Sequence, residues 1–393
     1  MDARITYIAR TNHRSDSRRF GIKREDRFLH LHVIGKTGVG KSTLLATMAI
    51  QDLVGAGGFA LIDPHGDLAD LVYQRAQSLG LDRVIYLNAT DPAQPYGYNP
   101  LRHIRADRIP LAASGLLEVF KKMWADAWGV RMEHILRNAL YALLEQPNAT
   151  LMDISRLFRD KAYRRTVAAS LTNEPVRIFW EKEFDRYSLA YRADGVASIQ
   201  NKVGAFLADP QIRRILIEPK EPISLRRIMD QGQVLLVNLG KGTIGEDSSS
   251  LLGGLLVTTI GLAAFSRADT VPERRRDFFV YVDEFQSFTT LAVANMLSEL
   301  RKYRVGLTMA HQYLYQLEPE IRHAVLGNAG TLISFRLGAE DAPLVSRELL
   351  EKFDAGDLQR LDNRTFYIRL MIDGRPSQPF SATTGFPISD VPH

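Results

Sequence analysis

The chain has 393 residues with ordinary proportions of hydrophobic (45%) and charged (24%) residues, so it is long enough to bury a substantial core. It contains no cysteine, which excludes disulfides, thiolate metal sites and cysteine nucleophiles. The formal net charge of +5 fits a nucleic-acid partner, but many basic proteins bind none.

The first hundred residues alternate between strand and helix patterns. Phe28–Ile34 is a short apolar run that ends at a glycine-rich turn, and a helix candidate follows at Ser42–Leu53. Phe59–Asp63 and Val84–Leu87 are the next two buried strands. Strand, helix and strand at this spacing predict a parallel sheet with crossover helices.

The pattern then changes. From about 101 to 227 helical periodicity dominates, as in Leu111–Trp124, Met132–Leu144 and Ser198–Leu207, and strand-like runs are scarce. We predict an all-helical insertion domain at 101–227, with 1–100 and 228–393 forming one discontinuous α/β domain. The strands expected in the second stretch are Val234–Asn238, Phe278–Asp283, Val305–Ala310, Thr331–Arg336 and Thr365–Met371, with helices at Ser248–Ser266 and Thr290–Lys302.

The longest apolar stretch is Leu251–Phe265, which is interrupted by Gly253, Gly254, Thr258 and Thr259. It is short for a membrane span, so we predict a buried core helix and no transmembrane segment. The polar N-terminus has no signal-peptide core. The expected location is the cytoplasm, with recruitment to the inner membrane by a partner left open.

The segment GKTGVGKS at Gly35–Ser42 matches the full Walker A pattern between a strand and a helix. Its glycines let backbone amides point at phosphate oxygens, and the helix N-terminus adds partial positive charge. Lys41 is expected to reach the β- and γ-phosphates of ATP, and Ser42 to ligate Mg²⁺. The predicted nucleotide-binding residues are Gly35, Thr37, Gly38, Val39, Gly40, Lys41, Ser42 and Thr43.

The segment FFVYVDEF at Phe278–Phe285 is an apolar strand that ends in two carboxylates, the Walker B arrangement. Asp283 is expected to hold Mg²⁺ through water, and Glu284 to act as the general base. The second carboxylate favours a hydrolysing motor over a kinase-like or simple binding site. The fold class predicted is α/β, a RecA-like P-loop NTPase with a mainly parallel sheet flanked by helices and an all-α insertion.

Five short motifs follow one another along the chain: GKTGVGKSTLL, LIDPHGD at Leu61–Asp67, YNPL at Tyr98–Leu101, VDEF at Val282–Phe285 and LRKYRVGLTMAHQ at Leu300–Gln312. In the order and spacing of these motifs the chain resembles the HerA–FtsK superfamily of ring ATPases, and within it the coupling proteins of type IV secretion and conjugation (TraG/TraD-like). The resemblance covers about Phe20 to Arg369. About 30 residues precede the core strand, and we expect these to be too few for the membrane helices or the small β-barrel with which such proteins begin.

The resemblance implies roles for three further residues. Gln312 corresponds to a glutamine that senses the γ-phosphate, and Arg301 to an arginine finger presented to the neighbouring subunit's ATP. A polar strand end and a solvated helix end are the alternative interpretations of these two residues. Arg304 and Arg336 are the other finger candidates. Asp63 corresponds to an acidic residue near the nucleotide, although a plain turn explains it nearly as well.

Three basic features could contact DNA, and each also has an ordinary structural interpretation. They are the loop Gly240–Gly242 around Lys241, the run Arg274–Arg276, and a cluster in the insertion. No base-reading motif is recognised, so backbone contacts with little sequence specificity are expected. The cluster consists of Lys121, Lys122, Trp124 and Trp128.

The leading hypothesis is therefore an ATP- and Mg²⁺-dependent DNA translocase that works as a homo-oligomeric ring, expected to be a hexamer. One alternative is the ATPase of a protein-secretion machine, with a polypeptide substrate. Another is the ATPase or scaffold subunit of a nuclease-bearing defence complex, in which the nucleotide acts as a switch. The sequence leaves open whether the DNA is single- or double-stranded, the direction of movement, the number of subunits in the ring and the partner protein. It also leaves open whether the role is conjugation, defence or DNA processing.

Overall fold

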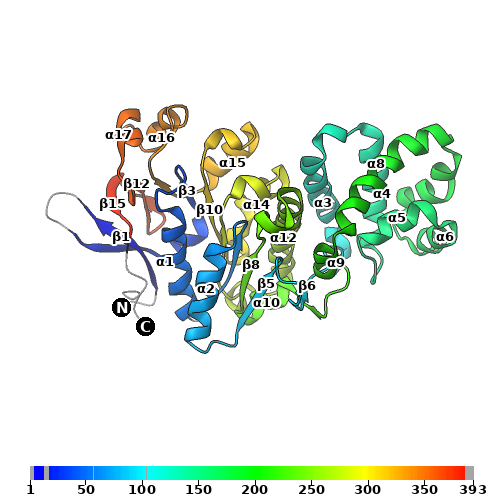
Figure 1. Ribbon diagram of the computed structural model, residues 1–393, viewed down its shortest axis with the longest axis horizontal. Helices are drawn as coiled ribbons and strands as arrows, with labels where there is room; N and C mark the ends of the chain where they lie inside the picture. The colour runs from blue at the N-terminus through cyan, green and yellow to red at the C-terminus, as the bar shows by residue number, and fades with distance from the viewer. Residues whose placement is uncertain (1–3, 13–16, 56, 103, 386–393) are drawn as a thin grey trace. The chain divides into compact units, whose positions relative to one another are not determined.

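The computed structural model describes residues 4–12, 17–55, 57–102 and 104–385, apart from the side chains of 189–194 (Figure 1). The chain divides into two compact units, and each consists of separated stretches of sequence. The first unit takes Met1–Tyr86, Arg226–Leu239 and Arg267–His393, and the second takes Leu87–Leu225 and Gly240–Ser266.

The first unit is built on a sheet that has eleven strands among the described residues, in the order β2-β1-β15-β12-β11-β3-β10-β9-β4-β8-β5. The run from β11 to β8 is parallel, whereas the strands from β2 to β12 pair antiparallel with one another and with β11. The strands are β1 Ile5–Thr11, β2 Arg19–Lys23, β3 Leu31–Ile34, β4 Gly58–Asp63, β5 Val84–Asn88, β8 Val234–Asn238, β9 Phe278–Val282, β10 Val305–His311, β11 Thr331–Ser334, β12 Thr365–Arg369 and β15 Phe380–Thr383.

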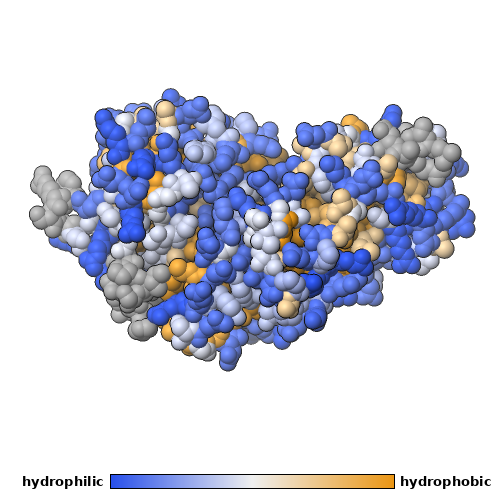
Figure 2. All heavy atoms as spheres, viewed as in Figure 1, coloured by the Kyte–Doolittle hydropathy of each residue, from blue (hydrophilic) through white to orange (hydrophobic). Residues whose placement is uncertain are grey.

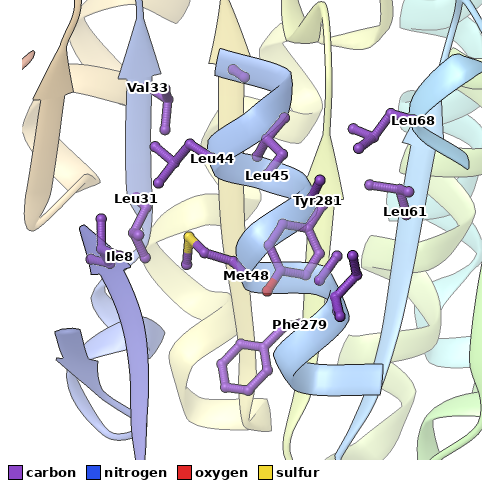
Figure 3. Close-up of a cluster of buried hydrophobic side chains, with 14 of the residues drawn as sticks. Ile8, Leu31, Val33, Leu44, Leu45, Met48, Leu61, Leu68, Phe279 and Tyr281 are labelled. Atoms are coloured by element: carbon purple, nitrogen blue, oxygen red, sulfur yellow. The ribbon is translucent and has the colours of Figure 1, made fainter. Parts of the chain in front are cut away.

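Helices cover this sheet, and α1 and α2 pack side by side (Figure 1). The strands β3, β4 and β9 are buried along their whole length, and they are mainly apolar, as is typical of parallel strands covered on both faces. Figure 3 shows the resulting core, in which α1 contributes Leu44, Leu45 and Met48. The helices of this unit are α1 Lys41–Val54, α2 Asp67–Ser78, α10 Leu225–Gln231, α13 Phe285–Phe288, α14 Leu291–Leu300, α15 Pro319–Asn328, α16 Ala342–Glu348 and α17 Ala355–Arg360; a small ladder joins β13 Met371–Ile372 to β14 Arg375–Pro376.

A buried ion pair lies within this core. Arg27 donates two hydrogen bonds of 2.7 Å to the two carboxylate oxygens of Asp52, and further ones to Thr6 and Tyr281. Its guanidinium also lies 3.4 Å from the ring centroid of Phe279. Burial opposes the charged form, but the Asp52 and Tyr281 oxygens raise the pKa of Arg27 above its ordinary value. The cluster ties β1, α1 and β9 together.

Replacing Asp52 with alanine should therefore destabilise the protein severely. The Arg27 charge would stay buried without its carboxylate partner, which costs about 3–5 kcal/mol of unfolding free energy. Denaturant unfolding measures this loss. The control is Glu299→Ala, which removes an exposed ion pair with Lys302 and should leave the unfolding free energy almost unchanged. Equal small losses in both variants would contradict the assignment.

The second unit is mainly helical. The span 101–227, for which an all-helical domain was expected, contains one strand of only two residues among its described residues. This strand, β7 Glu221–Pro222, pairs parallel with β6 Tyr96–Gly97. The helices are α3 Ile109–Met123, α4 Val130–Leu144, α5 Met152–Arg159, α6 Lys161–Ser170, α7 Glu174–Ile178, α8 Leu189–Ala208, α9 Pro210–Leu216, α11 Lys241–Ile244 and α12 Glu246–Ser266.

The limits of this unit differ from the expected 101–227, because it begins at Leu87 and also includes α12. Helix α12 packs against α3, and the two approach closely at Gly115. A Cβ placed there would lie 2.8 Å from Thr258 Cγ2. The apolar pattern identified α12 as a core helix but carried no signal for which core it joins.

One helix of the described chain, Glu246–Asp269, is long and apolar enough to cross a membrane by length and composition alone. Inside the structure 78% of its apolar window is buried, as expected for a core helix. The face of the molecule in Figure 2 carries mainly hydrophilic residues, with hydrophobic ones in small patches.

Candidate functional site

The site residues meet because three strands are neighbours in the sheet. The order β3-β10-β9 is parallel, so the carboxyl ends of these strands lie at one edge. The Walker A loop follows β3, Gln312 follows β10, and Asp283 and Glu284 follow β9. Residues separated by some 270 positions in sequence are thereby brought within hydrogen-bonding distance.

The Walker A loop turns sharply into α1. Gly40 caps the helix with φ of 117°, a backbone conformation that glycine adopts without strain. Gly35 has no room for a side chain, since a Cβ there would lie 2.6 Å from Cβ of Phe335. Val39 is fully buried, and its carbonyl accepts a 2.7 Å hydrogen bond from the amide of Arg364. The backbone of the loop is therefore fixed by packing against Phe335 at Gly35 and by the hydrogen bond from Arg364 at Val39.

Lys41 lies inside this loop and is only 6% exposed. Its Nζ donates to the carbonyls of Gly35 at 2.6 Å and Lys36 at 3.0 Å. Burial lowers the pKa of Lys41, and the charges of Asp283 and Glu284 partly oppose that shift. Because neutral carbonyls hold the ammonium, its charge is still available to an anion such as a phosphate.

Ser42 and Asp283 form the pair expected to hold a metal ion. Ser42 Oγ donates to Asp283 Oδ2 at 3.4 Å. Burial, followed by the charges of Asp63 and Glu284, raises the pKa of Asp283 to about 6. The amide of Glu284 and the charge of Lys41 stabilise the charged form of Asp283 only in part, and a bound cation would stabilise it further. One hydroxyl and one carboxylate are a donor set that fits Mg²⁺, which keeps several water ligands.

Glu284 is held by two glutamine amides. Gln312 Nε2 donates to Oε1 at 2.7 Å, and Gln286 Nε2 donates to Oε2. Thr37 Oγ1 in turn donates to Gln312 Oε1 at 3.0 Å. Glu284 also has φ of 48°, a strained conformation that tends to occur at functional sites. Gln312 thus bridges the Walker A loop and the candidate general base.

Asp63 lies next to this cluster, where its carboxylate caps α2. Its oxygens accept hydrogen bonds from the backbone amides of His65, Leu68 and Ala69 at 2.8–3.1 Å. Asp63 therefore fixes the start of α2 and adds negative charge beside Asp283. Its expected contact with the nucleotide stays a prediction.

Arg301 is apart from the other predicted site residues. It is exposed in a short 3-10 helix, Arg301–Tyr303, that precedes the amino end of β10, whereas Gln312 follows the carboxyl end. The two other finger candidates have structural partners. Arg304 binds Asp277 and Glu25, and Arg336 donates to Leu361 O and Asn363. Of the three candidates only Arg301 is exposed, and its role as a finger stays a prediction.

The contacts that support the Walker A loop from neighbouring segments were not predicted from the sequence. Arg336 O accepts a hydrogen bond from the amide of Lys36, and Arg364 O accepts one from Thr384. Two histidines, His32 and His311, are buried beneath the loop. A histidine within an otherwise apolar strand was a signal that could have been noticed, whereas the supporting arginines had no local signal.

The three basic features expected to contact DNA differ in how far their side chains already make structural contacts within the protein. Lys241 begins the short helix α11 instead of lying in a free loop. Arg275 and Arg276 donate to backbone carbonyls, among them Lys302 O and Gln231 O. Trp124 is buried and stacks on Phe120, and Trp128 donates to Glu133. Of the three, the structural interpretation is therefore strongest for the tryptophans.

No family model and no curated protein sequence matches the chain. Solved structures do match it. The unbound monoclinic form of the bacterial conjugative coupling protein TrwBdeltaN70 is 17% identical, with 96% of this chain and 88% of that one covered and a TM-score of 0.66. VirB4 of Thermoanaerobacter pseudethanolicus is 13% identical, with 98% and 97% covered and a TM-score of 0.66. TrwB in complex with ADP and Mg²⁺ is 18% identical, with 92% and 87% covered and a TM-score of 0.63.

These comparisons bear on the fold. The large, mostly parallel sheet flanked by helices matches that of TrwB and VirB4 over most of the chain, so the predicted fold class is confirmed. The resemblance to conjugative coupling proteins is likewise confirmed for the fold.

Proposed function

We propose that this chain is an ATP-hydrolysing motor subunit that moves DNA as part of a homo-oligomeric ring. The observation that carries the proposal is the bridge from Thr37 through Gln312 to Glu284, which joins the phosphate-binding loop to a carboxylate. A site that only binds nucleotide has no need of such a carboxylate. A site that hydrolyses ATP needs it close to the terminal phosphate.

The residues fit ATP and Mg²⁺. The amides of the loop at Gly38–Gly40 and the N-terminus of α1 suit the phosphates, and Lys41 supplies a positive charge. Ser42 and Asp283 would hold Mg²⁺, which neutralises charge on the phosphates when bound. TrwB, whose fold this chain shares, was solved with the non-hydrolysable analogue ADPNP and with ADP and Mg²⁺, which supports this assignment.

Hydrolysis follows from the placement of Glu284. Its carboxylate would take a proton from the attacking water, while the amides of Gln312 and Gln286 keep it oriented. A neighbour's Arg301 would add positive charge to the transferring phosphoryl group. Such a site is complete only between two subunits, and a ring, expected to be a hexamer, satisfies every subunit at once.

DNA is the proposed substrate because the fold matches plasmid and conjugative coupling proteins and the chain is basic overall. The second candidate is the ATPase of a secretion machine acting on polypeptide. It is supported by the equally good match to VirB4, which covers nearly all of both chains.

The test compares the ATPase rate with and without DNA over a range of salt, alongside the mass of the assembly. A DNA motor should be stimulated strongly by DNA, and the stimulation should fall steeply as salt rises. An ATPase rate that does not change with DNA would reject DNA as the substrate and favour the secretion ATPase. If the mass shows that the active ATPase is a monomer, the proposed ring is rejected.

Lys41→Ala should abolish nucleotide binding or hydrolysis while leaving the fold intact. The variant loses the one ammonium that lies inside the loop, and the carbonyls it served can turn to water. Nucleotide titration and circular dichroism check the two halves of this expectation. The control is Lys36→Ala, an exposed lysine of the same loop, which should retain binding. A folded Lys41→Ala protein with normal ATPase activity would refute the site.

A further inference from the structure

Two buried histidines form a hydrogen-bonded pair directly beneath the Walker A loop. His32 lies in β3 and His311 ends β10, and neither is exposed. Their Nε2 atoms lie 2.5 Å apart, and the ring planes differ by 12°. Neither residue has a part in the binding or hydrolysis described above. A polar pair in an apolar interior is costly unless it is satisfied, so its presence calls for an explanation.

The hydrogen-bond partners fix the tautomer of each ring. His311 Nδ1 lies 3.0 Å from Tyr313 O, and because a carbonyl can only accept, Nδ1 must carry the proton. His311 Nε2 is then the acceptor, and His32 Nε2 donates to it. His32 Nδ1 is left as a lone pair with no partner among the described atoms. Burial lowers the pKa of His311 to about 4 and that of His32 well below its ordinary value, so both rings stay neutral near pH 7.

The pair links the two segments that the nucleotide site depends on. His32 precedes the Walker A loop on its own strand, and the amide of Gly35 donates to His311 O at 3.3 Å. Gln312, which contacts both Thr37 and Glu284, is the next residue after His311. The side chain of His311 is held at one nitrogen by His32 and at the other by Tyr313 O. The backbone just before Gln312 is therefore locked to β3.

We propose that His32 and His311 are positioning residues that fix Gln312 against the Walker A loop and thereby allow the site to distinguish ATP from ADP. This inference rests on the proposed function, because it assumes that Gln312 senses the γ-phosphate. A pair that served only stability would be replaced at little cost by well-packed apolar side chains. If the pair orients Gln312, the same replacement would also change the relative affinities for ATP and ADP.

The test measures the affinities for ADP and for a non-hydrolysable ATP analogue, both with Mg²⁺, by calorimetry. The wild type should favour the analogue. His32→Leu should lower that preference roughly five- to tenfold, the usual effect of one hydrogen bond, and leave ADP affinity unchanged. His32→Gln should restore the preference, because its amide can donate to His311 Nε2. If His32→Leu does not fold, His32→Asn takes its place, since the shorter amide cannot reach that atom.

A double-mutant cycle with Gln312→Ala shows whether the pair acts through Gln312. In that background His32→Leu should change the preference no further, whereas additive losses would overturn the proposal. The proposal is also overturned if thermal stability falls while the ratio of the two affinities stays the same. If the wild type prefers the ATP analogue but does not hydrolyse ATP, the proposed motor is rejected. The ratio of the affinities for the analogue and for ADP would still decide the role of the histidines.

Discussion

Arg301→Ala should bind ATP normally but hydrolyse it about 10³–10⁵-fold more slowly, the range measured for arginine fingers. Arg301 precedes β10, and the seven residues of that strand separate it from Gln312. At about 3.3 Å per residue this is roughly 20 Å, beyond the reach of an arginine side chain. Arg301 therefore cannot contact the nucleotide of its own subunit, and in the proposed ring a large loss of hydrolysis would arise at a neighbouring subunit's site.

Mixing Arg301→Ala with Glu284→Gln subunits tests this directly. Some interfaces of a mixed ring pair an intact Glu284 with an intact Arg301, and these should recover hydrolysis that neither variant shows alone. Lys302→Ala, the adjacent exposed lysine, is the matched control and should keep near-normal activity. A structure of the assembled ring with Arg301 directed away from the neighbour's phosphates would exclude the finger, and Arg336 and Arg304 would be examined next.

Glu284→Gln should bind ATP with near-normal affinity and hydrolyse it about 10²–10⁴-fold more slowly, the usual effect of losing a general base. The substitution also disturbs the local hydrogen bonds. Both carboxylate oxygens of Glu284 accept from glutamine amides, and a new amide nitrogen would face one of those donors. Part of the loss should therefore reflect a misplaced Gln312 or Gln286.

Single-turnover hydrolysis together with nucleotide affinity separates these effects. Gln286→Ala removes one of the two amide contacts and leaves the carboxylate in place, so it should cost far less than Glu284→Gln. If Glu284→Gln lost ATP affinity as severely as turnover, Glu284 would have to hold the nucleotide instead of activating water.

The nucleotide site could be located from sequence because its parts are local. Gly35–Ser42 must follow a strand and open a helix, and Asp283 and Glu284 must end an apolar strand, so pattern and position identify them together. Gln312 was found through the resemblance. Its partners Thr37 and Glu284 could not be predicted, because they depend on β10 lying between β3 and β9.

Features built by distant pairing escaped the sequence analysis. Strands β1 and β2 were not predicted, although β1 alternates in burial, and β1 pairs with β15 from the far end of the chain. The contact between His32 and His311 joins positions separated by most of the sequence. Likewise, the assignment of α12 to the second unit depends on its close approach to α3 at Gly115, and periodicity cannot show which partner an apolar helix chooses.

Because each unit consists of separate stretches of sequence, neither unit can be produced as a single continuous fragment of the chain. The polypeptide passes between the two units four times, at 86/87, 225/226, 239/240 and 266/267. A fragment restricted to 87–225 would lack α12 and expose the face of α3 on which that helix packs. Conversely, excising only 87–225 would leave α12, a helix of 21 residues with the apolar stretch Leu251–Phe265, without the α3 face on which it packs, and the exposed apolar residues would favour aggregation. Expressing the first unit alone therefore requires two deletions, 87–225 and 240–266, whereas expressing the second alone requires the removal of three separate stretches.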